Sequence, residues 1–297
     1  MARSGPVSAI LLSAAAVVSS CRAHGVVRVD PFPPGERALG PEVAVVVWNV
    51  RKGLDARLRD DLWEIALVED PDLLLVQEGR ADLHPSDRRG GVFGKSWRFP
   101  WSRTAAEGVG TFSRVRPERV ELAPSRWREF FVTAPKASLV TFYPLNDGRK
   151  LLVANVHLLV FERWGTRRLR DQLADLHERM EGHDGPVLLT GDFNTWSAKR
   201  LALVEELARN LCLEEVQGFP AGRRTADKGW KPLNWLLGID PSLPLDRVYV
   251  RGLTPLRAEV LGAWRSSDHV GISAVLHVDS SVRSSPSGQR FAYAGTS

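Results

Sequence analysis

The chain has 297 residues and a formal net charge of +5, with 43% hydrophobic and 25% charged residues. These are the values of an ordinary globular protein, and the length allows one large domain or two smaller ones. The two cysteines, Cys21 and Cys212, exclude a disulfide framework and a cysteine/histidine zinc site. The basic balance favours an anionic partner such as nucleic acid or an acidic lipid surface, although arginine-rich composition can equally reflect genomic base content.

The first twenty residues differ from the rest of the chain. Arg3 precedes an apolar run of small residues, Ala9 to Val18, which is too short to cross a bilayer stably. We therefore predict a secretory signal over residues 1–20. Val18-Ser19-Ser20-Cys21 is similar to a bacterial lipobox, in which the cysteine is diacylated and becomes the mature N-terminus. An ordinary cleaved signal or an uncleaved anchor, with Cys21 incidental, is the alternative.

Composition divides the remainder into three parts. Residues 21–41 contain Pro31-Phe32-Pro33-Pro34-Gly35 and are predicted to be a tether. Residues 42–278 are predicted to be one catalytic domain. Residues 279–297 are serine-rich and polar, which predicts a disordered tail.

Strand-like and helix-like runs alternate along the predicted domain. A loop-rich stretch is expected over residues 81–128, which contain several glycines. Strands are predicted over 43–50, 73–76, 140–143, 151–156, 186–190, 247–250 and 270–278, and helices over 58–68, 167–180 and 198–213. This order predicts an α/β four-layer sandwich, in which two packed, mostly antiparallel β-sheets are flanked by helices.

Six short polar signatures lie on or beside the apolar runs. They are Trp48-Asn49-Val50, Gln77-Glu78, Asn155-Val156-His157, Gly191-Asp192-Phe193-Asn194, Leu245-Asp246-Arg247 and Ser267-Asp268-His269. A polar side chain at the end of a buried strand is costly unless it has partners, so six such places indicate one shared site. Hard oxygen ligands together with two histidines indicate magnesium-assisted attack on a phosphate ester.

In this order the signatures resemble those of the endonuclease/exonuclease/phosphatase superfamily, which includes deoxyribonuclease I, AP endonucleases, bacterial sphingomyelinases and inositol-polyphosphate phosphatases. The resemblance covers roughly residues 43–278. Each motif alone is weak, whereas all six in order are poorly explained by chance. The resemblance implies a phosphoric ester hydrolase that depends on Mg²⁺, with Mn²⁺ as an alternative cation.

The resemblance also implies roles for individual residues. Glu78 would be the principal carboxylate ligand of the metal, with Asn49 beside it. Asp268 would help to bind metal or to position the attacking water. Mg²⁺ keeps several of its waters, so this sparse set of protein ligands is chemically adequate.

The remaining signatures would carry the chemistry. Asp192 would orient or deprotonate the attacking water, and the Asn194 amide would donate to a phosphate oxygen. His269 would be hydrogen-bonded to Asp246, which fixes its tautomer. His157 would contact the phosphate or protonate the leaving oxygen, and the sequence leaves open which histidine is acid and which is base.

Two arginines favour a nucleic acid substrate over a lipid. Arg80 matches the DNA-contacting residue of the Gln-Glu-x-Arg pattern in deoxyribonuclease I, and Arg247 matches that enzyme's Asp-Arg pair. The Arg- and Trp-rich segment 88–128 supplies either phosphate contacts and stacking surface, or core aromatics with solvated arginines. Val270-Gly271 replaces the aromatic and proline that follow Ser-Asp-His in the named relatives, which predicts a divergent bacterial member.

Two alternative functions remain. One is a lipid-acting phosphodiesterase or phosphatase at a membrane surface, for which the segment from Trp230 to Leu237 would be the inserting loop. The other is an inactive binding module on the same fold. We expect a monomer that is exported and held at the cell envelope by a lipid on Cys21, with a secreted protein as the alternative location.

Overall fold

A computed structural model describes residues 25–30, 32–53, 55–83, 85, 88–97, 106–127, 136–160, 162, 165–219, 240, 242–262 and 266–281. The predicted signal, the lipidation site Cys21, the segment from Trp230 to Leu237 and the tail beyond residue 281 lie outside the described residues. Within the described residues, every helix is too short or too polar to cross a membrane.

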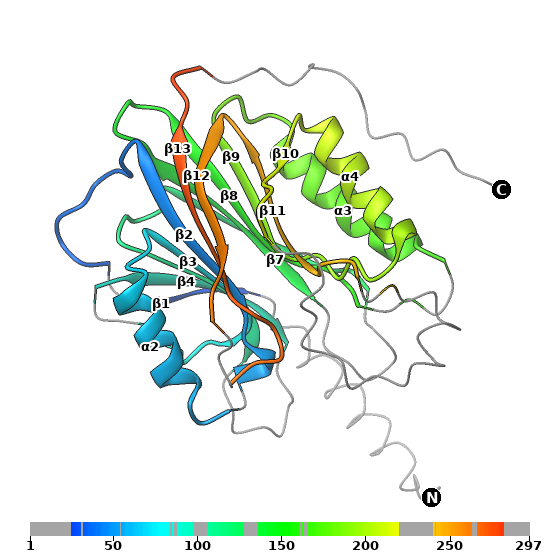
Figure 1. The fold of residues 1–297 in the computed structure, drawn as a ribbon, viewed down its shortest axis with the longest axis horizontal. Coiled ribbons are helices and arrows are strands. Elements are labelled where there is room, and N and C mark those ends of the chain that lie inside the picture. The colour runs from blue at the N-terminus through cyan, green and yellow to red at the C-terminus, as the bar shows by residue number, and fades with distance from the viewer. Residues whose placement is uncertain are drawn as a thin grey trace, which may run out of the picture.

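Two β-sheets packed face to face form the centre of the molecule (Figure 1). The first sheet has the order β1 (Gly25–Asp30), β4 (Gly90–Trp97), β5 (Glu107–Ser113), β3 (Leu73–Arg80), β2 (Glu42–Asn49), β13 (Ile272–Val278) and β12 (Leu253–Val260). The second has the order β10 (Glu214–Glu215), β11 (Asp246–Arg251), β9 (Val187–Asp192), β8 (Lys150–His157), β7 (Ala137–Pro144) and β6 (Arg119–Pro124). The pairs β2–β3 and β8–β9 are parallel and the other pairs are antiparallel, as the mostly antiparallel prediction requires.

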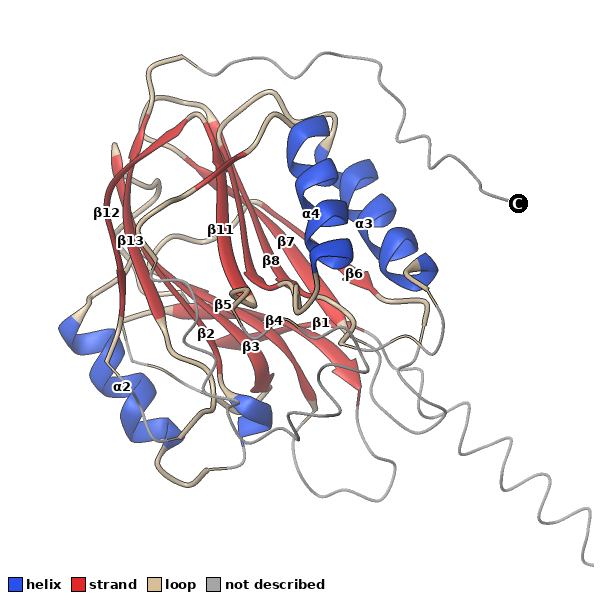
Figure 2. Cartoon of the chain, turned by 45° about the vertical axis from the view of Figure 1, so that its right-hand side comes forward, coloured by secondary structure: helices blue, strands red, loops and turns tan. Residues whose placement is uncertain are grey.

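Helices cover the outer face of each sheet (Figure 2). Helix α2 (Leu58–Val68) packs Leu58, Leu62 and Ile65 against the outward side chains of β2 and β3. Helices α3 (Arg167–Met180) and α4 (Ala198–Asn210) lie side by side on the second sheet. A single 3₁₀ turn, η1 (Arg51–Gly53), follows β2. The predicted four-layer sandwich is confirmed.

The layer between the sheets is mainly apolar, and a buried polar pair crosses it near the end where the signatures lie. Alternate residues of each strand, such as Val45, Leu75 and Val153, point into this layer. Asn155 and Gln77 are fully buried there, and Gln77 Nε2 donates to Asn155 Oδ1 at 2.7 Å across the two sheets. Asn155 Nδ2 donates in turn to the carbonyl oxygen of Gly110 at 2.9 Å. Asn155 therefore fastens the sheets together beside the site.

The expectation of a loop-rich stretch over residues 81–128 is wrong in part, because β4, β5 and β6 lie within this range. Their glycines permit close packing and do not mark turns. A Cβ on Gly108 would lie 2.0 Å from the carbonyl oxygen of Gly94, and one on Gly94 would lie 2.5 Å from Leu122 Cδ1. Glycine is needed where backbones approach this closely. The edge strand β12 was also missed, because Pro255 interrupts its pattern beside a bulge.

The predicted tether over residues 21–41 is wrong in part. Residues 25–30 form β1, whose backbone pairs with the edge of β4. Leu39 is buried in the layer between the sheets, and its N–H donates to the carbonyl oxygen of Pro144 at 2.9 Å. At the other end, Asp279 accepts a hydrogen bond from Thr254. The folded unit therefore extends beyond residues 42–278 in both directions.

Candidate active site

Strand direction brings the polar signatures to one edge of the sandwich. The parallel pairs β2–β3 and β8–β9 end at this edge, and the antiparallel strands β11 and β13 begin near it. Contacts between the sheets join the two halves of the edge. The side chains that meet there are Asn49, Glu78, His157, Asp192, Asp246 and His269.

Asp192 is the centre of this cluster. Its Oδ2 accepts a hydrogen bond from Asn49 Nδ2 at 2.8 Å, and its Oδ1 accepts one from the backbone N–H of Asn194 at 2.9 Å. The Nε2 atoms of His157 and His269 lie 3.7 and 4.0 Å from the same Oδ2. Burial raises the pKa of Asp192, which makes it a stronger base than an exposed aspartate. Asn49, predicted as a metal ligand, thus bridges to the predicted base.

His269 carries a carboxylate partner on its far nitrogen. Its Nδ1 lies 2.8 Å from Asp246 Oδ2, which is the predicted pairing. Burial alone would lower the pKa of His269, but the negative charges of Asp246 and Asp192 raise it to about 10. The backbone is fixed as well, because Trp48 Nε1 donates to the His269 carbonyl and Ser267 Oγ accepts from its N–H. His269 is therefore an imidazolium at neutral pH in this arrangement.

The pKa of His157 is shifted in the opposite direction to that of His269. It is buried, and burial together with the nearby positive charge of Lys136 lowers its pKa to about 4. Its Nε2 lies 3.4 Å from Glu78 Oε1 and 3.7 Å from Asp192 Oδ2, without a hydrogen-bond partner among the described residues. Two histidines beside one aspartate are thus held in different protonation states, an arrangement typical of acid–base sites.

Glu78 is turned into the cluster by an irregularity in β3. The register of β3 against β5 shifts between Val76 and Gly79, and Glu78 has a φ of +52°. Its Oε1 lies 3.0 Å from Lys136 Nζ. Burial works to raise the pKa of Glu78, but the positive charges of His157 and Lys136 lower it to about 2. His157 contributes because it is protonated at the low pH where Glu78 titrates.

Lys136 is a site residue that sequence reasoning missed. It directly precedes β7 and reaches across to β3 of the other sheet. A single lysine before an apolar strand belongs to none of the six signatures. Its place in the sequence carries no signal of the contact, which depends on how the two sheets face each other.

Arg247, predicted to bind substrate, does not join the site. It follows Asp246 directly on β11, and consecutive side chains of a strand point to opposite faces. Its Nε donates to Thr195 Oγ1 at 3.1 Å and its Nη1 donates to Glu215. Arg247 is therefore buried outside the cluster, and its position gives no support to the predicted role in substrate binding.

Three other predicted site residues lie at the margin of the cluster. Asn194 is buried, and its Nδ2 donates to the carbonyl oxygen of Leu158, which ties the loop after β9 to the loop after β8. Arg80 forms a two-point ion pair with Asp82 on the side of α2. Asp268 is 38% exposed and faces Arg51, yet its charge still helps to raise the pKa of His269.

The cluster fits a divalent cation. Ligand atoms of Asp192, Asp246 and His269 all lie within 4.8 Å of one another. Two buried polar atoms of the cluster, His157 Nε2 and Asp246 Oδ1, have no protein partner among the described residues. Carboxylate oxygens are the ligands that Mg²⁺ and Mn²⁺ prefer, and Glu78 adds a further ionised carboxylate at the same edge.

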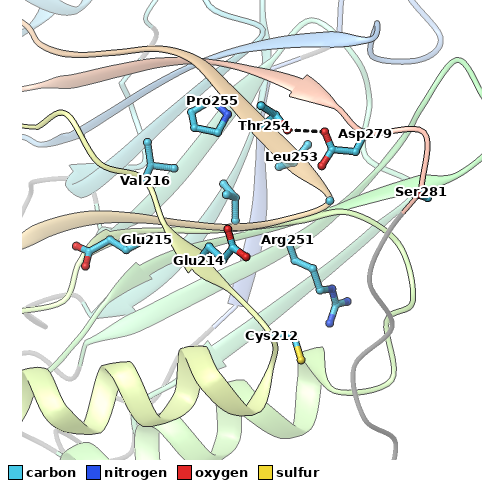
Figure 3. Close-up of a pocket in the computed structure, with 12 residues that line it drawn as sticks. Cys212, Glu214, Glu215, Val216, Arg251, Leu253, Thr254, Pro255, Asp279 and Ser281 are labelled. Carbon is cyan, nitrogen blue, oxygen red and sulfur yellow. Dashed lines mark hydrogen bonds between the residues drawn. The ribbon is translucent and has the colours of Figure 1, made fainter.

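A separate cavity of about 460 Å³ lies at the other end of the sandwich (Figure 3). It is lined by residues around the turn from β11 to β12, including Arg251 and Leu253, and by Asp279 after β13. Asp246 begins β11 and His269 precedes β13, whereas the cavity lies at the other end of both strands. The cavity is therefore not part of the cluster. Cys212, which also lines it, is only half-buried, with a φ of +53°.

Comparison with known proteins gives concordant results. The sequence profile described as the Endonuclease/Exonuclease/phosphatase family matches residues 46–269. A UPF0294 protein of Yersinia enterocolitica is 32% identical over 239 residues, which cover 80% of this chain and 85% of that protein. A UPF0294 protein of Vibrio cholerae is 31% identical over 236 residues, which cover 74% and 73% of the two chains.

Solved structures share the fold. An endonuclease/exonuclease/phosphatase from Beutenbergia cavernae gives a TM-score of 0.58 at 14% identity, covering 80% of this chain and 72% of that chain. The human Nocturnin catalytic domain with bound sulfate anion gives 0.53 at 20% identity, covering 85% and 97%. ANGEL2, described as a 2′,3′-cyclic phosphatase, gives 0.54 at 15% identity with the same coverage. At these identities the similarity concerns the fold alone.

Proposed function

Because the chain belongs to the endonuclease/exonuclease/phosphatase family, we propose that it is a divalent-cation-dependent phosphodiesterase. One observation carries this proposal: a buried aspartate lies within 4.0 Å of both histidines, one with a raised pKa and one with a lowered pKa, next to a glutamate whose pKa is lowered. A binding module has no need of such an arrangement, because separate protonation states serve proton transfer.

The residues of the chain divide the work as follows. Asp192, whose pKa is raised by burial, takes the proton of the attacking water. The His269 imidazolium, held by Asp246, donates a hydrogen bond to a phosphate oxygen and neutralises its growing negative charge. His157 is neutral, and its unpartnered Nε2 faces the same space to donate to the phosphate or the leaving oxygen. The charge on His269 excludes it as the base, and we propose Asp192 for that role.

Glu78 would hold the cation, with Asp192 and Asp246 as neighbouring carboxylates. When bound, the cation supplies Lewis-acid polarisation of a phosphoryl oxygen. Mg²⁺ is the cation that we propose, with Mn²⁺ as the alternative, because the donors are carboxylate oxygens rather than thiolates.

We propose nucleic acid as the substrate class. The formal net charge of +5 supports an anionic polymer, and Arg51 and Lys52 stand exposed on η1, which begins two residues after Asn49. We further propose that the enzyme is a monomer, exported and anchored by a lipid on Cys21, on the lipobox-like sequence alone.

Incubation of the purified full chain with plasmid DNA, sphingomyelin and inositol phosphates, each with and without EDTA, tests these proposals. We expect cleavage of DNA that EDTA abolishes and that His269→Ala loses. Turnover of lipid without cleavage of DNA would replace the substrate class, and no metal-dependent turnover of any of them would refute the enzymatic function. Labelling of cells with a radioactive fatty acid tests the anchor, since a signal unaffected by Cys21→Ser would exclude it.

A further inference from the structure

Lys136 forms an ion pair with Glu78, the carboxylate that we propose as the ligand of the cation. Lys136 Nζ lies 3.0 Å from Glu78 Oε1, and the two side chains are only 12% and 17% exposed. The contact bridges the two sheets at the edge where the other site residues gather. His157 Nε2 approaches the same oxygen at 3.4 Å, so one oxygen atom faces both a cationic and a neutral donor.

The pair compensates a buried charge. A carboxylate this deeply buried is costly unless an opposite charge or several hydrogen bonds compensate it. Among the described residues, Lys136 supplies that positive charge, and it contributes to the low pKa of Glu78. A lysine on a flexible four-carbon stem can do this without a fixed geometry, which an arginine fork would demand.

A divalent cation and an ammonium on the same carboxylate repel each other at that distance. Binding of the cation therefore weakens the contact between Lys136 Nζ and Glu78. The ammonium lies at an edge that also holds His269, where an incoming phosphate offers new acceptor oxygens.

We propose that Lys136 couples the binding of the cation to the binding of the substrate phosphate, pairing with Glu78 when the cation is absent and with a phosphate oxygen when it is present. The proposal rests on the proposed function, since it takes Glu78 to be the cation's carboxylate. It has two consequences. Lys136 weakens the cation's affinity for the substrate-free protein. Phosphate strengthens the binding of the cation, and the cation strengthens the binding of phosphate by the same factor.

The experiment measures Mn²⁺ binding to the full chain from the free Mn²⁺ signal in electron paramagnetic resonance, with and without inorganic phosphate. The variants are Lys136→Met, Lys136→Arg and Glu78→Gln. Lys150→Met is the matched control, because Lys150 is also a paired lysine but lies at the far end of β8, with its Nζ 2.7 Å from Glu118.

We expect Lys136→Met to bind Mn²⁺ roughly tenfold to a hundredfold more tightly than the wild type, which is the range of one charge-assisted hydrogen bond. Phosphate should strengthen Mn²⁺ binding in the wild type and lose this effect in Lys136→Met. Lys150→Met should bind Mn²⁺ within about twofold of the wild type. Lys136→Arg keeps the positive charge and should stay closer to the wild type than Lys136→Met does.

The outcomes separate this proposal from the one on which it rests. If the wild type binds no Mn²⁺, or binds it equally well in Glu78→Gln, the assignment of the cation to Glu78 fails and the coupling fails with it. If Glu78→Gln abolishes binding but Lys136→Met binds Mn²⁺ no more tightly than the wild type, only the coupling is overturned. Thermal unfolding of each variant identifies a loss of fold. Should Lys136→Met be unfolded, Lys136→Gln takes its place with the same expectation.

Discussion

Substitution of Asp246 by asparagine tests the electrostatics of the site most directly. Asp246→Asn keeps the shape and an acceptor oxygen 2.8 Å from His269 Nδ1, but removes the negative charge. The raised pKa of His269 has four causes that oppose burial: the charge of Asp246, its hydrogen bond, and the charges of Asp192 and Asp268. Asp246 supplies the two largest of these, so the variant should return the pKa of His269 most of the way toward 6.5.

The size of the effect follows from the same pKa. The difference between 6.5 and about 10 corresponds to about 5 kcal/mol of preference for the imidazolium, at about 1.4 kcal/mol per pKa unit. Because the folded-state pKa is raised, this contribution to stability is fully present below pH 6.5 and is lost as the pH rises through about 10. We expect Asp246→Asn to lower the free energy of unfolding by about 3 kcal/mol at pH 6, with the difference shrinking toward zero above pH 10.

Two measurements check this expectation on the EDTA-treated protein. Urea denaturation across the pH range gives the difference in unfolding free energy, and an NMR titration of the imidazole signals gives the pKa of His269 itself. Asp147→Asn is the matched control, because Asp147 lies in an exposed turn and pairs with Arg149. With the cation restored, Asp246→Asn should also lower kcat by roughly 10²- to 10⁴-fold, the usual contribution of a positioned acid or base.

A stability difference that does not vary between pH 6 and pH 10 would show that Asp246 acts by packing or hydrogen bonding and not through the charge of His269. An imidazole that still titrates near 10 in the variant would show the same. Either result would remove the reason for assigning the imidazolium role to His269.

Three further substitutions test the fold around the site. Asn155→Leu leaves the Nε2 of Gln77 unpaired inside the sandwich. It should lower the free energy of unfolding, measured by urea denaturation, by about 2–4 kcal/mol. An unchanged urea midpoint would mean that the link between the sheets is unimportant. Gly108→Ala brings a methyl group against a backbone oxygen 2.0 Å away and should lower the free energy of unfolding by about 3 kcal/mol or more. The control Gly182→Ala, with no atom within 4 Å of the added carbon, should be close to neutral. Equal effects of the two substitutions would contradict the close-packing explanation. Arg247→Met should lower stability by about 1–3 kcal/mol while leaving KM within about twofold, and a large rise in KM with unchanged stability would restore its predicted role in substrate binding.

Elements with strong periodicity could be predicted from the sequence, whereas glycine-rich strands could not. Helix α2 runs over Leu58–Val68 as its apolar spacing predicts, because the face that it buries is written at helical intervals. Strands β4 and β5 carry glycines where neighbouring backbones approach each other. The same residue type marks turns elsewhere, and only the three-dimensional contact distinguishes the two uses.

The site shows the same division. Polar residues at strand ends could be found because each one contradicts the apolar run beside it, as His157 does at the end of β8. Lys136 lies in no such motif, and its contact with Glu78 depends on the packing of two sheets whose strands are distant in the sequence. The position of Arg247 outside the cluster could not be foreseen, because similarity of a dipeptide does not say which face of a strand each residue occupies.

The sequence left open which histidine is the acid and which is the base. The charge of each ring depends on its neighbours and not on the histidine itself. Both rings lie within 4.0 Å of Asp192 Oδ2, so that carboxylate does not distinguish them. His269 has a second carboxylate, Asp246, on its other nitrogen, whereas His157 has the ammonium of Lys136 nearby. Lys136→Met should therefore raise the pKa of His157 above about 4 and leave that of His269 near 10 in the same NMR titration. A parallel rise of both would mean that the charges are shared across the cluster and that neither histidine has a fixed role.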